Sequence, residues 1–153
     1  MQKTGYVVIW LLLLQLGGRA GQIGYLWSFD DLRSKSDLVV IAAVVATRDT
    51  GIRTVINELQ PPFPVVELNT QFKIVSVVKG TSSGEMLVLR HYRLDTDRLR
   101  GGVVNAARPL DFTTNGSAIE YLLFLKRDAG EIFVPTSGQV FPGDSVFALC
   151  KAG

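Results

Sequence analysis

The sequence predicts a mainly β protein, with five to seven short strands in a small closed barrel or a sandwich and one short helix near the N-terminus. Three observations predict this class. Apolar, β-branched runs recur along the chain, separated by clusters of glycine, proline, aspartate and serine. Helix start signals are sparse. The chain has one cysteine, so its stability must come from a packed core and not from intrachain disulfides.

The first twenty residues are typical of a cleaved export signal. Lys3 gives a positive start, residues 5–16 are apolar, and Gly18-Arg19-Ala20 offers small residues for a signal peptidase. An uncleaved anchor is the alternative, but the apolar stretch ends after about 14 residues and a spanning helix needs about 20. We therefore expect cleavage near Ala20, a periplasmic or secreted protein, and no membrane span in the mature chain.

The charge balance changes when this leader is set aside. Two of the 16 basic residues, Lys3 and Arg19, lie in the leader, which leaves 14 basic and 14 acidic residues. Proteins that bind nucleic acid usually carry an excess of positive charge to displace counterions from phosphate. We therefore expect no nucleic-acid partner.

Cys150 is the only cysteine, which excludes an intrachain disulfide and a cysteine-based zinc site. It could form an intermolecular disulfide or act as a reactive thiol. The favoured interpretation is a small apolar residue that closes the last strand.

An N-terminal arm over 21–36 precedes the barrel domain, which we place at 37–153. Within the arm, Ser28 followed by Asp31 resembles a capping box with aspartate in place of glutamate. The sequence predicts one or two helical turns over 29–35, with Phe29 and Leu32 packed on the barrel.

The first half of the barrel domain contains two predicted strands and a stiff loop. Residues 38–47 are apolar on both alternating faces, which is typical of a strand covered on both sides. Residues 52–58 form a weaker strand. The prolines of 61–64 cannot donate ladder hydrogen bonds, so they predict a loop.

The second half contains two predicted hairpins. Residues 71–79 and 85–93 flank a Gly-Thr-Ser-Ser-Gly turn, and residues 121–126 and 131–135 flank the turn Asp128-Ala129-Gly130. Three phenylalanines of the last strands are expected in the core: Phe133, Phe141 and Phe147.

The order of these segments resembles a known family. Ser36-Asp37-Leu38-Val39-Val40-Ile41-Ala42, then Phe72-Lys73-Ile74-Val75-Ser76-Val77-Val78-Lys79-Gly80, then Tyr121-Leu122-Leu123-Phe124-Leu125 follow a short helix. This pattern, over about residues 28–149, resembles exported bacterial proteins related to the netrin module and the tissue inhibitors of metalloproteinases. The resemblance implies an OB-like (netrin-like), five-stranded barrel that presents loops to another macromolecule.

One departure from that family bears on function. Its inhibitors chelate the target's zinc through an N-terminal cysteine held by disulfides, whereas cleavage after Ala20 would leave Gly21 at the N-terminus. We therefore do not expect metalloprotease inhibition by that mechanism.

Catalytic and metal hypotheses centre on His91, the only histidine. A small hydrolase would need His91 in a cleft beside a serine or a carboxylate, and no Gly-x-Ser-x-Gly elbow is present. A metal site could use His91, Asp95 and Asp97. The surrounding arginines favour a solvated polar loop that neutralises the two aspartates instead. We expect no enzyme activity, no metal and no cofactor.

The long segment 94–117 has little regular pattern, and such loops are often functional. Its candidate partner-binding residues are Asp95, Asp97, Arg98, Arg100 and Arg108, with help from the loop 61–64. The sequence thus predicts an exported, non-catalytic module that binds another exported protein. The alternative is a barrel that binds an anionic carbohydrate or an oligonucleotide, which predicts salt-sensitive retention on heparin and exposed aromatics on one strand face.

Overall fold

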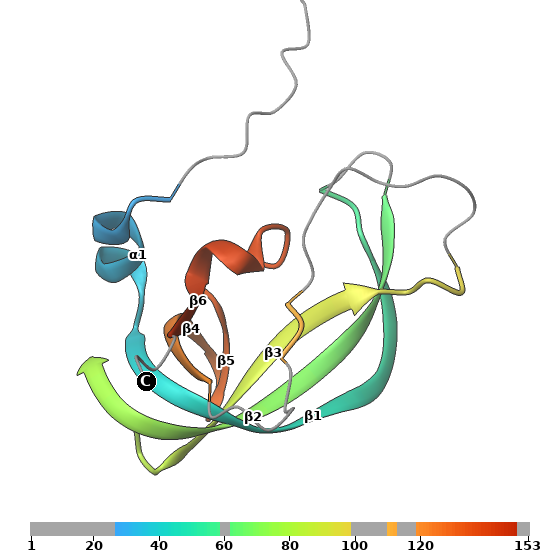
Figure 1. The fold of residues 1–153 in the computed structure, drawn as a ribbon. Helices are drawn as coiled ribbons and strands as arrows, with labels where there is room; N and C mark the ends of the chain where they lie inside the picture. Colours follow the sequence, from blue (N-terminus) through green and yellow to red (C-terminus); the bar gives the residue numbers. More distant parts are fainter. Residues whose placement is uncertain (1–26, 59–61, 99–109, 113–118, 150–153) are drawn as a thin grey trace, which may run out of the picture.

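A computed structural model describes residues 27–58, 62–98, 110–112 and 119–149. In these ranges the protein is mainly β, as the sequence predicts (Figure 1). The helical elements are α1 (Phe29–Lys35) and the 3-10 helix η1 (Pro142–Ser145). The strands are β1 (Leu38–Ile56), β2 (Phe63–Lys79), β3 (Met86–Leu94), β4 (Glu120–Ala129), β5 (Ile132–Pro135) and β6 (Val146–Leu149).

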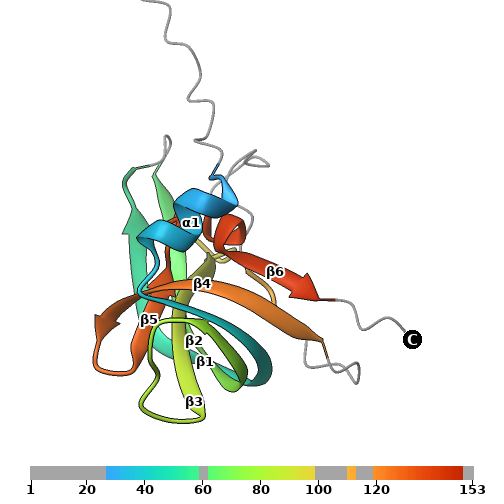
Figure 2. The same ribbon diagram turned by 90° about the vertical axis from the view of Figure 1, so that its left-hand side faces the viewer.

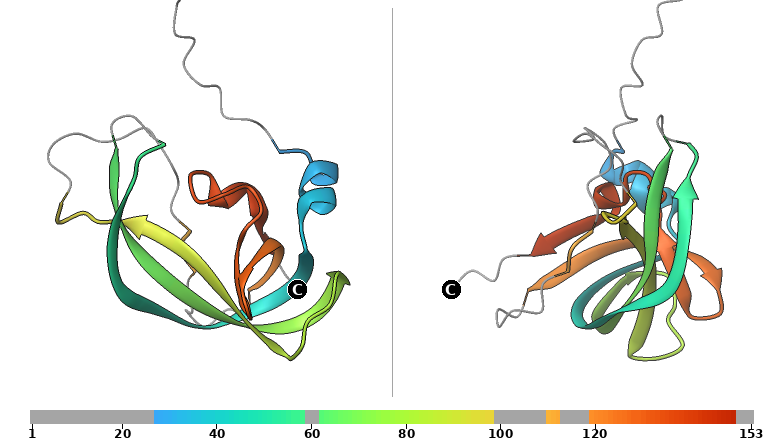
Figure 3. Two further views of the ribbon diagram at one scale, coloured as in Figure 1. Left: turned by 180° about the vertical axis from the view of Figure 1, so that it is seen from behind. Right: turned by 90° about the vertical axis from the view of Figure 1, so that its right-hand side faces the viewer.

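The strands form one sheet that closes into a ring. The strand order is β1-β2-β3-β5-β4-β6, and an additional pairing of β1 with β4 closes the ring. Neighbouring strands are antiparallel except for β3 and β5, which are parallel. The ring is uneven: β1 and β2 pair along most of their length and curve together, whereas β3 and β5 meet only at Val88↔Ile132 and Leu89↔Phe133 (Figure 3).

The predicted helix is confirmed as α1, with the predicted bounds. The Ser28 hydroxyl accepts the backbone N–H of Asp31 at 3.1 Å and so caps the first turn. α1 lies against β4 near β6 (Figure 2) and buries Leu32 completely. Phe29 stacks on Phe147 at 4.9 Å between ring centroids but stays 58% exposed, so its predicted burial is only partial.

β1 joins two segments that the sequence separates. The predicted strands 38–47 and 52–58 are one strand that ends at Ile56, because a register shift between Asp49 and Arg53 absorbs extra residues without breaking the pairing with β2. Gly51, with φ of +82°, supplies the unusual backbone there.

The expected proline loop is partly wrong, because β2 begins at Phe63 and includes Pro64. Proline is tolerated at this position because it lies near the start of the strand, where a missing N–H costs little. Its carbonyl is used, since it accepts the N–H of Asp95 at 3.0 Å.

Both predicted hairpins are present. β2 and β3 pair from Lys73↔Met86 to Val65↔Leu94. The turn between β4 and β5 begins two residues later than predicted, because Asp128 and Ala129 remain in β4 and Gly130 makes the turn with φ of +57°.

The main core fills the ring. Phe72, Phe112 and Tyr121 meet there edge to face, with centroid distances of 5.0 to 6.2 Å. The other buried members are Leu38, Val40, Ala42, Leu87, Leu89, Leu123, Leu125 and Phe133. The prediction of a core position is correct for Phe133 and wrong for Phe141, which is 42% exposed just before η1.

Replacing Lys79 with methionine is expected to destabilise the protein by about 1–2 kcal/mol. The Lys79 ammonium donates to the carbonyls of Arg33, Ser34 and Ser36 at 2.6, 3.2 and 2.7 Å, and so satisfies the C-terminal end of α1. Methionine keeps the length but offers no donor. Urea denaturation checks the loss, with Lys126→Met on the exposed end of β4 as the matched control.

Within the part of the chain that the structure describes, neither α1 nor η1 has the length and apolar content of a membrane-spanning helix. The predicted leader at 1–20 and Cys150 lie outside the described residues.

Candidate functional site

The β1–β2 hairpin and the end of β3 meet at one end of the molecule (Figure 1). We call residues 49–56, 63–67 and 92–98 the hairpin end. Its outer face has a small apolar cluster: Ile56, Phe63, Val65, Tyr92, Leu94 and Val140. This cluster packs the three strand segments together, whereas Arg93, which alternates with Tyr92 and Leu94 on β3, lies on the opposite face of the sheet.

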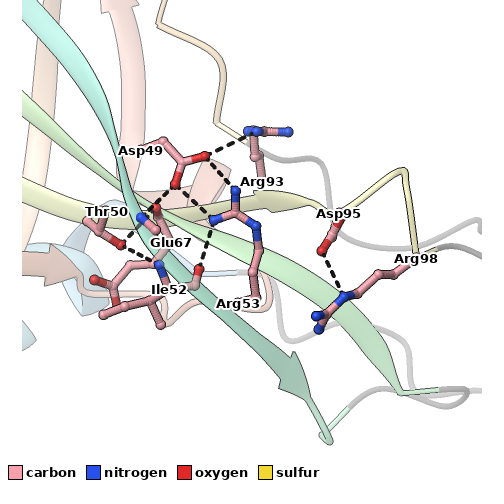
Figure 4. Close-up of polar contacts among 9 residues, drawn as sticks. Asp49, Thr50, Ile52, Arg53, Glu67, Arg93, Asp95 and Arg98 are labelled. Carbon is pink, nitrogen blue, oxygen red and sulfur yellow. Dashed lines mark hydrogen bonds and ion pairs between the residues drawn. The ribbon is translucent and has the colours of Figure 1, made fainter.

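Asp49 is the centre of the charged group in Figure 4. Its carboxylate accepts two hydrogen bonds from the Arg53 guanidinium, at 2.9 and 3.0 Å, and one from the Gly51 N–H at 2.8 Å. Arg93 of β3 approaches the same carboxylate at 3.5 Å. The paired Arg53–Asp49 bonds span the register shift in β1 and fix its geometry.

The ionisation of this group follows from the geometry. The hydrogen bond from Arg53, followed by that from the Gly51 N–H, lowers the pKa of Asp49 below its usual 3.8. The same bond raises the pKa of Arg53, and the negative charges of Asp95 and Asp97 add to it. Asp49 and Arg53 are therefore both charged at neutral pH.

Two of the predicted site residues form a pair. Asp95 is buried, and its carboxylate lies 3.6 Å from the Arg98 Nε, while the Arg98 side chain is 60% exposed (Figure 4). The Arg98 N–H also donates to the Asp95 carbonyl at 3.1 Å. Asp97 is exposed in the same turn. Arg100 and Arg108 lie outside the described residues.

The structure joins the two candidate segments of the sequence. The Asp95 N–H donates to the Pro64 carbonyl at 3.0 Å, so the start of the long segment after β3 is tied to the start of β2. The sequence does not predict the contribution of Asp49 and Arg53, because its pattern indicates two strands with a gap between them. The residues Asp-Thr-Gly at 49–51 are typical of a tight turn, and they are the one sequence feature that indicates the irregular backbone at this position.

His91 lies inside the ring, on the face of β3 that it shares with Leu87 and Leu89, as the alternation predicts. Its Nε2 forms a 2.8 Å hydrogen bond with the Thr70 hydroxyl, and its ring meets Phe112 edge to face at 5.1 Å. Burial lowers the pKa of His91 from 6.5 to about 4.

These contacts bear on the catalytic and metal hypotheses. The neighbours of His91 just described are a threonine and a phenylalanine in the interior, which gives the hydrolase hypothesis no support. Across the described ranges, no three histidine, cysteine or acidic side chains gather as metal ligands, so His91, Asp95 and Asp97 do not form the alternative metal site. Asp95 instead pairs with Arg98, but its carboxylate is buried and not solvated.

Comparisons of the chain with protein-family models, with curated proteins and with solved structures found no match.

Proposed function

We propose that this protein is an exported, non-catalytic interaction module with an OB-type ring, and that it binds another exported protein through the hairpin end. Three features support the OB type: β1 pairs with both β2 and β4, β3 and β5 are parallel, and five strands complete the ring. A short helix before β1 and the two hairpins also agree with the order of elements that the netrin resemblance implies.

The observation that carries the binding proposal is the hydrogen bond between Asp95 and Pro64. It ties the start of the segment 94–117 to the end of the loop 61–64, the two segments that the sequence predicts to form the binding surface. A binding surface built from both can therefore act as one unit, and the apolar cluster on the outer face of the same strands keeps the segments in place.

The charges of the hairpin end suit a protein partner. Asp49, Arg53 and Arg93 are held by mutual bonds, so little side-chain entropy is lost when a partner docks. Arg98 is the most exposed cation among the ion pairs of this end, and its planar fork matches a carboxylate. The proposal therefore favours a partner with an acidic residue opposite Arg98.

The alternative, an anionic glycan, has less support. It predicts exposed aromatics on one strand face, whereas the large apolar side chains exposed on the described strands are Val45, Ile52, Val55, Val75, Val77 and Val78. The arginines within residues 90–98 are also paired with acids, as in Arg90–Asp128 at 2.7 Å. Retention on heparin across a salt series remains the test of this alternative.

Arg98→Glu is expected to weaken binding of the partner about five- to tenfold, mainly through a slower association rate. The Arg98 side chain is largely exposed, but the substitution places a like charge beside the buried Asp95, so urea denaturation of the variant accompanies the binding measurement. Binding is measured by biolayer interferometry with the full chain and the exported protein that copurifies with it.

Lys126→Glu is the matched control, because it makes the same change of charge at an exposed position of β4. This variant should keep the association rate within about twofold of the wild-type value. Equal weakening by both substitutions would indicate a general charge effect and would contradict a specific role for the hairpin end.

A further inference from the structure

One edge of β1 has no strand partner beyond Ala43 in the part of the chain that the structure describes. β4 pairs with this edge only from Leu38↔Leu125 to Ala43↔Glu120, whereas β1 continues to Ile56. Beyond Ala43, β1 is the edge strand of the sheet that it forms with β2 and β3 (Figure 1). The backbone N–H and C=O groups of alternate residues on such an edge point away from the sheet, where another strand can pair with them.

Residues 46–49, which we call the edge window, form a regular part of this edge. Their register with β2 is unbroken from Ala46↔Gln71 to Asp49↔Leu68, and a register shift lies on each side. An added strand needs backbone groups at the regular spacing of a sheet, which a bulge disrupts. The edge window keeps that spacing over four consecutive residues.

A chain of side-chain hydrogen bonds holds the edge window against the strands beside it. The Thr47 hydroxyl bonds to the Thr70 hydroxyl at 2.8 Å, and the Thr70 hydroxyl bonds to the Nε2 of His91 at 2.8 Å. These residues come from β1, β2 and β3, so the chain joins all three strands. Because the edge window is ordered in this way, it loses little conformational entropy when another strand is added.

The face of the edge window that lies opposite Thr47 offers two different side-chain contacts to an added strand. Ala46 borders a depression of about 240 Å³ that extends over Gln71 and Val88. Because the Ala46 side chain is small, a large apolar side chain from an added strand can lie over it and enter the depression. Arg48 is exposed and, unlike Arg53, has no ion pair within the described ranges. An acidic side chain opposite Arg48 would therefore gain a new partner.

We propose that the edge window binds an extended segment of the exported partner as an added antiparallel strand, with a large apolar side chain over Ala46 and an acidic side chain opposite Arg48. The inference rests on the proposed function, because it specifies how the same partner contacts the strand that continues into the hairpin end. Antiparallel pairing is the more stable arrangement per residue. In it, the residue opposite Arg48 precedes the residue opposite Ala46 by two positions, so the partner segment contains an acidic residue, any residue and then an apolar residue.

The experiment is a titration of the full chain with the synthetic peptide acetyl-Thr-Val-Glu-Thr-Phe-Val-Thr-amide, followed by backbone amide NMR. Saturable shifts are expected at residues 46–49, with a dissociation constant on the order of 1 mM. Alternate amides of the edge window should exchange hydrogen more slowly in the complex. Of two peptides that are N-methylated at either the odd or the even residues, only one should lose binding, because an added strand donates to β1 through one of its edges.

Arg48→Glu tests the charge contact. The variant should bind the peptide about fivefold more weakly, and a peptide with lysine in place of glutamate should restore the binding. Lys126→Glu is the matched control, because it makes the same change of charge at an exposed position of β4 and should leave peptide binding unchanged.

Three results would overturn the proposal: no saturable shift at residues 46–49, equal loss of binding with both N-methylated peptides, or equal effects of Arg48→Glu and Lys126→Glu. Concentration-dependent protection of the same amides without peptide would show that a second copy of the chain occupies the edge, and would overturn it as well. Photo-crosslinking from position 98 tests the proposed function separately. A protein adduct there without peptide binding would contradict strand addition alone, whereas peptide binding without that adduct would contradict the proposed function alone.

Discussion

Lowering the pH from about 6.5 to about 4 should destabilise this protein by about 3 kcal/mol through His91 alone. In this window the unfolded chain protonates His91, whose ordinary pKa is 6.5, whereas the folded protein keeps it neutral until about pH 4. The unfolded state therefore binds more protons, and the free energy of unfolding falls as the pH falls. Below about pH 4 both states are protonated and the loss from His91 is complete.

The buried position of His91 explains the size of this effect. The side chain is 1% exposed, its Nδ1 has no hydrogen-bond partner among the described residues, and Phe112 packs against the ring. No compensating carboxylate appears among the causes of its pKa shift. Asp49, whose pKa is lowered from 3.8, loses its stabilising contribution only at lower pH, so the two effects separate.

Urea denaturation at several pH values measures the effect, with His91→Gln as the control. Glutamine stays neutral throughout and can still form a hydrogen bond with Thr70, so the variant should lose the part of the pH dependence that comes from His91. The same pH slope in the wild-type protein and in His91→Gln would show that His91 is not the group responsible.

Gly80→Ala should destabilise the protein by about 4 kcal/mol, more than most single substitutions. Gly80 has a φ of +83°, which non-glycine residues rarely adopt, and a Cβ at this position would lie 2.2 Å from the Asp37 carbonyl oxygen. Asp37 cannot easily move, because its N–H donates to the Leu125 carbonyl at 2.9 Å and its carboxylate accepts the Arg127 N–H at 2.9 Å.

Gly51→Ala is the matched control for this prediction. Gly51 has a φ of +82° but no atom within 4 Å of the added Cβ, so only the backbone strain of about 1–2 kcal/mol applies. The difference between the two variants in urea denaturation measures the clash with Asp37. Equal destabilisation of both would mean that the close contact at Gly80 carries no energetic weight.

The strand segments and α1 could be predicted because each has a local signal. The alternation through Leu87, Leu89 and His91 identified one buried face, and Ser28 marked the start of the helix. Closure of the ring had no local signal. It depends on pairing of β1 with β4, from Leu38↔Leu125 to Ala43↔Glu120, and periodicity does not identify the partner of a strand.

The candidate site was predictable only in part, for a similar reason. Asp95 and Arg98 stand close in sequence, so their pairing could be expected. The approach of Arg93 to Asp49 joins residues far apart in the chain and arises from the pairing of β1, β2 and β3. Contacts of this kind come from tertiary structure, which residue spacing alone does not reveal.

Site-specific photo-crosslinking in the exported fraction tests the central proposal most directly. A photoreactive residue at position 98 of the full chain probes the exposed hairpin end, and the same residue at position 30 probes exposed α1, across the molecule (Figure 1). The proposal predicts one stoichiometric protein adduct at position 98 and none at position 30. No adduct at position 98, or the same adducts at both positions, would contradict it.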